Sequence, residues 1–266
     1  MTAIMALMTA QWRVTVSYRV QTLLSFAALG FTVVPLYFIA DAVQPVMANA
    51  IRGEGGSAFS FLLVGTAVIS IVAVALSTIP SAVGAAIGSG TFEALLGTPT
   101  PPAVLIAGMG AFPLLMATVR AVVVLASGVL LGAHLAGGEI PTALLILLLI
   151  VVSHLAVGLI GGAMVLAFRT AGPLPRVMLL ASSLLGGVYY PTGVVPSWLR
   201  TISDILPLSY GLRALRRVLL NGAGLEAVRQ DVLILAGETS LLLAVGLGAI
   251  AAGFQFARRQ GTLTQY

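Results

Sequence analysis

The chain has 266 residues, of which 59% are hydrophobic and only 8% charged, and its formal net charge is +5. A soluble domain carries about a quarter charged residues, so this composition indicates an integral membrane protein. The chain has no cysteine, and all 13 of its basic residues are arginine. Without lysine it forms neither a P-loop for nucleotide phosphates nor a lysine Schiff base. The excess positive charge is expected near lipid headgroups rather than on nucleic acid.

Residues 3–19 come before the first long apolar stretch and combine apolar residues with Arg13, Arg19, Trp12 and Tyr18. Arginines and aromatic rings favour the headgroup level of a bilayer. We therefore interpret residues 3–19 as an interfacial helix that leads into the first span. The alternative is a simple extension of that span.

Six apolar stretches are long enough to cross a bilayer as helices, which takes about 20 residues each. They predict an all-α integral membrane protein with six transmembrane helices, at 21–43, 59–80, 103–133, 141–168, 176–195 and 232–257. We expect residues 1–266 to form a single transmembrane domain. Alternating strands of about ten residues, which a membrane β-barrel would need, are not seen.

Glycines recur at four-residue spacing in three places, namely Gly84 with Gly88, Gly128 with Gly132, and Gly158 with Gly162. Small residues at this spacing let membrane helices approach closely. A chain with 30 glycines produces such pairs by chance. We therefore do not assign these pairs to specific dimer contacts.

Three ionisable residues fall inside the predicted spans: Arg120, His154 and Glu238. Ionisable groups at such depth are costly and are candidates for function. Arg120 would either attract an anionic headgroup, pair with Glu238 along a transport pathway, or make a structural contact between helices. For His154 we favour a structural hydrogen bond, because no second metal ligand stands near it.

Residues 196–222 predict two short outer helices between the last two spans. In PSWLRTISDILP, Trp198 and Ile202 share an apolar stripe, and Pro207 ends the helix. The next stretch, LSYGLRALRRVLLNG, repeats leucine at helical spacing. Both helices are too short and too polar to span, which favours a re-entrant or amphipathic hairpin. The second also places three arginines on one face: Arg213, Arg216 and Arg217. They either bind phosphate groups or lie in a solvated face.

Two stretches together carry a family resemblance. SGTFEALLGTPTPP fits the pattern Gly-Thr-x-Glu-x-Leu-Leu-x-x-Pro through Gly90, Thr91, Glu93, Leu95, Leu96 and Pro99. YYPTGVVPSWLRTISDILPLSYGLRALR fits a second pattern through Tyr190, Pro191, Pro196, Trp198, Leu199, Pro207, Leu208, Ser209, Tyr210, Leu215 and Arg216. With the layout of the spans, both stretches resemble the permease subunits of type 2 ABC exporters.

The resemblance implies that residues 89–100, with Thr91 at their start, form a cytoplasmic coupling helix after the second span. Such a helix meets a groove on an ATP-binding subunit. Glu93 would make a charge-assisted hydrogen bond there, and Phe92, Leu95 and Leu96 would be buried in the groove. The alternative is a solvated turn whose acid is favoured by the helix dipole. Arg216, which belongs to the second pattern, is expected to hold the outer hairpin in place.

The resemblance also implies partners. We expect two copies of a separate ATPase that carries ATP and magnesium, a second permease that is the same chain or a different one, and surrounding lipids. This chain would hold no cofactor and bind no nucleic acid. The spans show no charged aqueous cavity, which favours export of an amphipathic, lipid-like or drug cargo.

Arginines divide equally between the two sides of the predicted topology, but Arg13 and Arg19 lie just before the first span. This favours cytoplasmic termini. The all-arginine usage and the many Ala, Gly and Val residues favour a GC-rich bacterial genome, and we therefore expect the bacterial cytoplasmic membrane. Two other classes remain open. A secondary transporter is expected to have buried acids near the middle of the membrane, and Glu238 is the single candidate in the predicted spans. A membrane enzyme would want a motif such as HExxH or G-x-S-x-G, and the chain has neither.

Overall fold

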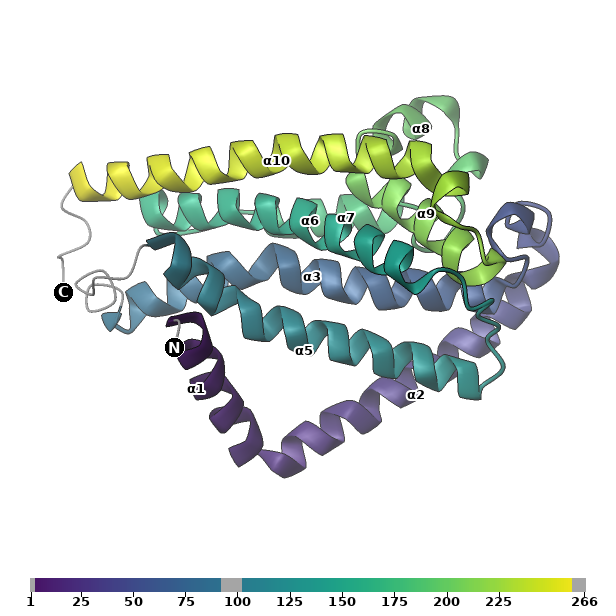
Figure 1. Ribbon diagram of the computed structural model, residues 1–266, viewed down its shortest axis with the longest axis horizontal. Coiled ribbons are helices and arrows are strands. Elements are labelled where there is room, and N and C mark those ends of the chain that lie inside the picture. Colours follow the sequence, from purple (N-terminus) through teal and green to yellow (C-terminus); the bar gives the residue numbers. More distant parts are fainter. Residues whose placement is uncertain (1–2, 92–101, 260–266) are drawn as a thin grey trace.

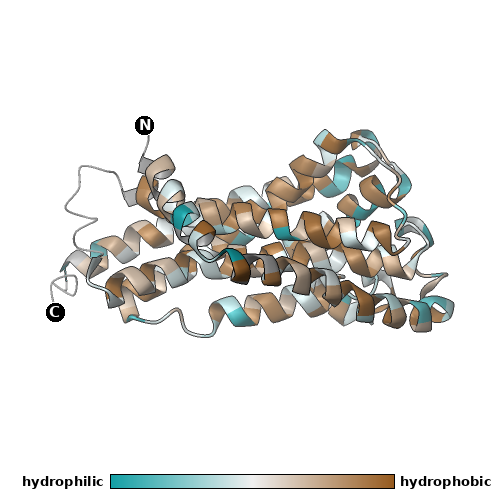
Figure 2. Cartoon of the chain, turned by 90° about the horizontal axis from the view of Figure 1, so that it is seen from below, coloured by the Kyte–Doolittle hydropathy of each residue, from teal (hydrophilic) through white to brown (hydrophobic). Residues whose placement is uncertain are grey.

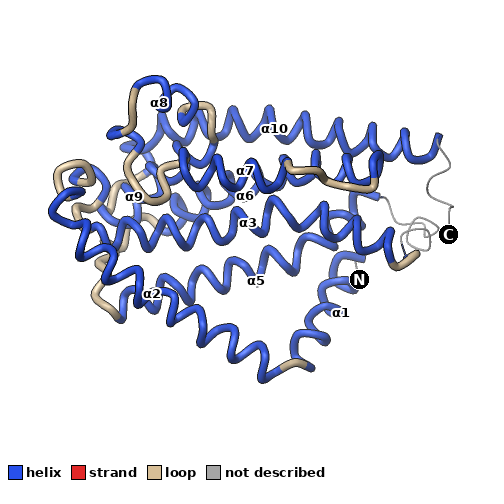
Figure 3. Tube along the Cα trace, turned by 180° about the vertical axis from the view of Figure 1, so that it is seen from behind, coloured by secondary structure: helices blue, strands red, loops and turns tan. Residues whose placement is uncertain are grey.

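The computed structural model describes residues 3–91 and 102–259. In this part of the chain all regular elements are helices, joined by short loops (Figure 3). In chain order they are α1 (Ala3–Ser17), α2 (Arg19–Met47), η1 (Arg52–Glu54), α3 (Ala58–Gly88), α5 (Pro102–Leu130), α6 (Ile140–Phe168), α7 (Leu174–Leu185), η2 (Thr192–Val194), α8 (Ser197–Ser203), α9 (Pro207–Asn221) and α10 (Leu225–Arg259).

Five of these helices are long and apolar enough to cross a membrane, namely α2, α3, α5, α6 and α10. Apolar residues run along the full length of the long helices (Figure 2). The five correspond to the first four predicted spans and the sixth. The largest difference in their starting points is at α10, which begins at Leu225 rather than at residue 232. The chain is therefore an all-helical, multi-pass membrane protein.

The predicted fifth span, 176–195, is not a full-length helix. The helix found there, α7, has 12 residues and ends at Leu185. Twelve residues rise about 18 Å, well short of the hydrocarbon core of a bilayer. The helix stops because Gly186 and Gly187 follow it, and Gly187 adopts φ +77°, a left-handed conformation that favours glycine. The prediction of six full spans is therefore wrong at this position.

The long helices form a row in which α10 packs on α6, α6 on α3, and α3 on α5 (Figure 1). Helix α3 is the most buried of the five. Helix α2 packs against α3 and α5, and α7 lies against α3. We call the end of the bundle at Gly88 and Pro102 the base. We call the opposite end, formed by η1, α8, α9 and residues 131–139, the hairpin end.

Helix α1 is separated from α2 by a break at Tyr18, whose φ of −99° and ψ of 50° are not helical. It folds back onto α5, where the rings of Trp12 and Phe112 meet edge to face with centroids 6.5 Å apart. Residues 3–17 are therefore a separate helix rather than a continuation of α2. Its placement at the membrane interface stays a prediction.

Two of the recurring glycines bring α6 against α3 within one chain. A Cβ on Gly158 would lie 2.8 Å from the carbonyl oxygen of Ala75, and one on Gly162 would lie 2.7 Å from Ile79. Gly88 and Gly132, in contrast, have no neighbour within 4 Å of an added Cβ. The spacing of Gly158 and Gly162 therefore serves the contact between α3 and α6.

We expect Gly158→Ala to destabilise the fold by about 1–3 kcal/mol, because the added methyl group meets a backbone carbonyl that has no room to move. The control is Gly237→Ala, since Gly237 on α10 has no neighbour within 4 Å. There the better helix propensity of alanine should leave stability unchanged or raise it. Unfolding in detergent by heat or denaturant measures both. Equal stability of the two variants would contradict the close packing of α3 on α6.

Candidate functional site

The hairpin that follows α7 is held together by two serines at the ends of its helices. The hydroxyl of Ser203 donates a hydrogen bond to the Leu185 carbonyl at 2.6 Å, and the hydroxyl of Ser209 donates to the Ser203 carbonyl at 2.7 Å. Both serines are buried. Carbonyl groups at helix ends lack partners inside the helix, so these hydroxyls satisfy the ends of α7 and α8. The half-length α7 thus ends in a fixed turn.

The prolines of the second sequence pattern lie where the short helices of this hairpin begin. Pro191 directly precedes η2, Pro196 directly precedes α8, and Pro207 is the first residue of α9. Proline fits the first position of a helix because its missing N–H has no partner there anyway. Trp198 is exposed on α8, and Tyr210 on α9 lies under the guanidinium of Arg213, 5.4 Å from its ring centre.

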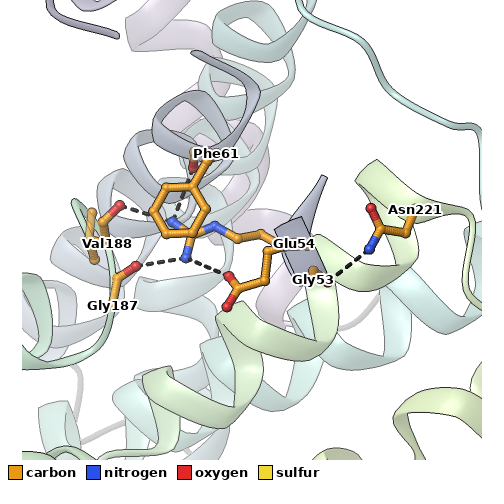
Figure 4. Close-up of polar contacts among 7 residues, drawn as sticks. Gly53, Glu54, Phe61, Gly187, Val188 and Asn221 are labelled. Atoms are coloured by element: carbon orange, nitrogen blue, oxygen red, sulfur yellow. Dashed lines mark hydrogen bonds and ion pairs between the residues drawn. The ribbon is translucent and has the colours of Figure 1, made fainter. Parts of the chain in front are cut away.

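Arg216 on α9 is the largest fully buried side chain of the described residues, with 1% of its surface exposed. Its Nη1 donates to the carbonyl of Gly187 at 2.7 Å, and its Nη2 donates to the carbonyls of Val188 at 2.9 Å and Phe61 at 3.1 Å (Figure 4). The Glu54 carboxylate of η1 lies 3.4 Å from Nη1. One guanidinium therefore joins the turn after α7, the start of α3, and η1. We call this group of contacts the arginine clamp.

The space around the clamp is closed. The Arg216 Cζ lies 3.3 Å from the centre of the Phe61 ring, and a Cβ on Gly65 would come within 2.7 Å of Nη2. Burial lowers the pKa of Arg216 to about 10, and Glu54 opposes this shift. The side chain therefore remains charged at neutral pH. Asn221, at the end of α9, adds a hydrogen bond of 2.8 Å to the Gly53 carbonyl beside Glu54 (Figure 4).

The three arginines of α9 do not share one environment. Arg213 and Arg217 reach Asp231 at the start of α10, at 3.3 Å and 3.6 Å, and their side chains are 28% and 42% exposed. Arg216 points into the protein instead. The predicted single arginine face is therefore wrong, because successive positions of α9 meet α10 on one side and α3 on another.

His154 is fully buried between α6 and α7. Its Nδ1 lies 2.7 Å from the Ile150 carbonyl and 3.1 Å from the Ser153 hydroxyl, and its Nε2 lies 3.4 Å from the Ser182 hydroxyl of α7. Two of these contacts lie within α6 and the third reaches α7, and a structural role for His154 stays a prediction. Among the described residues there is no group of three or more potential metal ligands.

Arg120 and Glu238 do not pair with each other. They belong to α5 and α10, which stand at opposite ends of the helix row, and the ion pairs of the described residues do not include them. Arg120 is exposed near the middle of α5. Glu238 is half-buried, and its Oε2 is buried without a hydrogen-bond partner in the described part of the chain. Of the alternatives offered for Arg120, a pairing with Glu238 inside one chain is therefore not seen among the described residues.

The predicted coupling residues lie mostly outside the described residues: Phe92, Glu93, Leu95 and Leu96. Thr91 is described and exposed, and its hydroxyl lies 2.8 Å from that of Ser89. Just before it, α3 ends at Gly88, and Gly90 has φ +68°, a left-handed turn that commonly ends a helix. The chain thus leaves α3 at the base directly in front of the motif.

The sequence did not point to the partners of the arginine clamp. Glu54 stands 162 residues before Arg216, and the loop that carries it has no motif. In the sequence, Gly65 and Phe61 are distinguished only by lying in a predicted apolar span. The one signal was the place of Arg216 in the second pattern.

Five apolar helices of spanning length, with a clamped hairpin at one end, define the membrane domain of a multi-pass membrane protein. The sequence model of the ABC-2 type transporter family matches residues 2–220, and the chain belongs to this family. The match runs from α1 to the end of α9 and so includes Arg216 and the whole hairpin. A search of curated proteins gives no match. A member of this family is a transport subunit and not itself a catalyst.

Proposed function

We propose that the chain is the membrane-spanning permease of an ATP-driven exporter, with ATP and magnesium bound by a separate ATPase. Membership of the ABC-2 type transporter family supports a permease. The resemblance of residues 89–100 to a coupling helix supports an ATPase partner. Two ATPases and two permeases, the second being this chain or another, would form the complete transporter.

The observation that carries the proposal is the path of α3. This helix has 31 residues and rises about 46 Å from one end of the bundle to the other. Near its start, Phe61 and Gly65 contact the arginine clamp, and its end at Gly88 directly precedes the coupling motif. A movement imposed at residues 89–100 would therefore reach the hairpin through one continuous helix.

In this proposal the ATPase meets the base through Glu93, Phe92, Leu95 and Leu96, and the base and both termini face the cytoplasm of a bacterial cell. The hairpin end then faces outward. Because α7 spans only part of the bilayer, the hairpin would lie partly within it and move against the cargo. The polar residues of the spans are few, which supports an amphipathic, lipid-like or drug cargo.

Arg120 fits the proposal as a contact for an anionic group that this chain does not supply. An exposed guanidinium at mid-span is costly in hydrocarbon. A lipid phosphate, an anionic cargo or an acid of the second permease would offset that cost.

The test is to purify the tagged full-length chain in mild detergent from its native host and to identify what accompanies it. We expect a P-loop ATPase to co-purify, and the reconstituted complex to move cargo only with ATP. Absence of any ATPase, under conditions that preserve other membrane complexes, would contradict the proposal. If transport stops when an ion gradient is removed, with ATP present, the chain is a secondary transporter rather than part of an ATP-driven exporter.

A further inference from the structure

An apolar cavity of about 210 Å³ lies between α5 and α6, over the face of α3, near the hairpin end. Val64 and Ile71 of α3 form its floor, and Leu215 and Leu219 of α9 form its roof. All its lining side chains are hydrocarbon except that of Thr118, whose hydroxyl donates to the Leu114 carbonyl at 3.0 Å. The cavity therefore offers no free polar group to a ligand.

Such a cavity does not hold water. A water molecule needs two or more polar partners, and engineered apolar cavities of about 150 Å³ stay dry and bind small apolar molecules. Left empty, the cavity would cost its lining the contacts that close packing normally supplies. An apolar ligand removes that cost.

The mouth of the cavity opens toward the membrane-facing surface. Val122 of α5 is 58% exposed, and Leu144 of α6 is 59% exposed. Both residues belong to helices that are long and apolar enough to span a membrane, so we expect lipid hydrocarbon outside the mouth. The floor, in contrast, is closed: Val64 and Ile71 are exposed by 1% and 2%.

We propose that this cavity binds one acyl chain of a membrane lipid. The chain enters between α5 and α6 and ends against α3, beneath α9. Because the lining holds no charged group, binding depends on the acyl chain and little on the headgroup. Leu215 and Leu219 stand on either side of Arg216 in the sequence, so the bound acyl chain supports the helix that carries the arginine clamp.

The test uses the full chain in nanodiscs of phosphatidylcholine that carries a photoreactive diazirine on one acyl chain. Cross-linked residues are mapped by mass spectrometry of peptides. We expect labelling of the floor and inner wall, at Ile71 and Ala121, which bulk lipid does not reach because both are buried. The variant Ala143→Phe puts a ring into the cavity and should lower labelling at those two positions roughly tenfold.

The matched control is Leu148→Phe. Leu148 lies on the same helix and is 58% exposed, and it is not part of the lining. In this variant, the lipid probe should label the floor of the cavity as strongly as it does in the parent protein. A second filling variant, Ala121→Leu, keeps the test valid if Ala143→Phe does not fold.

Three results would overturn the proposal. The first is a parent protein labelled only on exposed positions such as Leu148. The second is unchanged floor labelling in folded Ala143→Phe. The third is an absence of lipid labelling at the mouth, at Val122 and Leu144, while Leu148 is labelled, which would mean that the mouth is not open to lipid.

Discussion

Replacing Arg216 with alanine is expected to lower the free energy of unfolding by about 3–5 kcal/mol, since removing one partner of a buried ion pair leaves the rest of the group without compensation. The carbonyls of Phe61, Gly187 and Val188 lose their donors, and Glu54 loses its cation. A loss of this size is a large part of the stability of a typical domain. We expect little folded protein in the membrane, and a hairpin that is open to protease.

Arg216→Lys should be nearly as harmful, because an ammonium group does not reproduce the planar fork of donors that reaches three separate segments. The double variant Arg216→Met with Glu54→Gln should recover part of the loss, since no buried charge is then unpaired. The control is Arg213→Ala, one turn earlier on α9. Its ion pair with Asp231 is partly exposed, so its loss should cost less than about 1 kcal/mol.

These effects are measured by thermal unfolding of the purified proteins and by limited proteolysis of residues 186–206. If Arg216→Ala is as stable as Arg213→Ala, the clamp does not hold the hairpin. If Arg216→Ala folds normally but transport is lost, the clamp acts in the transport cycle rather than in stability. Either result would change the role that the structure gives to Arg216.

The long helices could be predicted from the sequence because a bilayer imposes a simple rule on each of them. A spanning helix must satisfy its own backbone and present about 20 apolar residues, so α3 and α6 are visible as uninterrupted apolar runs. The fifth predicted span shows where this rule fails. Residues 176–195 are mostly apolar, but Gly186 and Gly187 end the helix, because local backbone geometry there outweighs hydropathy.

The candidate site was less predictable, because its contacts join segments that are far apart in the sequence. The place of Arg216 in a motif indicated that it matters, but its partner Glu54 stands in a loop without pattern. For Arg120 and Glu238, the sequence suggested a contact that the structure does not contain. Opposite charges in two apolar spans suggested a pair, and the order of helices in the row separates them.

Reversing the charge of Glu93 is expected to release the ATPase partner. In the proposed coupling helix, Glu93 accepts a hydrogen bond from a cation or a backbone N–H of the ATPase. A hydrogen bond to a charged group contributes about 1.5–3 kcal/mol. Glu93→Ala should therefore weaken ATPase binding roughly tenfold to a hundredfold. Glu93→Arg should weaken it further, because it adds like-charge repulsion. Quantitative mass spectrometry of the ATPase retained on the tagged chain measures both variants.

The control for this prediction is Glu226→Arg, which makes the same change of charge at the start of α10, at the hairpin end, on an exposed residue. It should retain the ATPase as the parent does, so a general effect of net charge is separated from a local one. Equal retention by Glu93→Arg and Glu226→Arg would show that the ATPase binds without Glu93. The leucines of the same motif would then carry the contact. Leu96→Asp would test them, because it would place a carboxylate in an apolar groove, and that cost does not depend on Glu93.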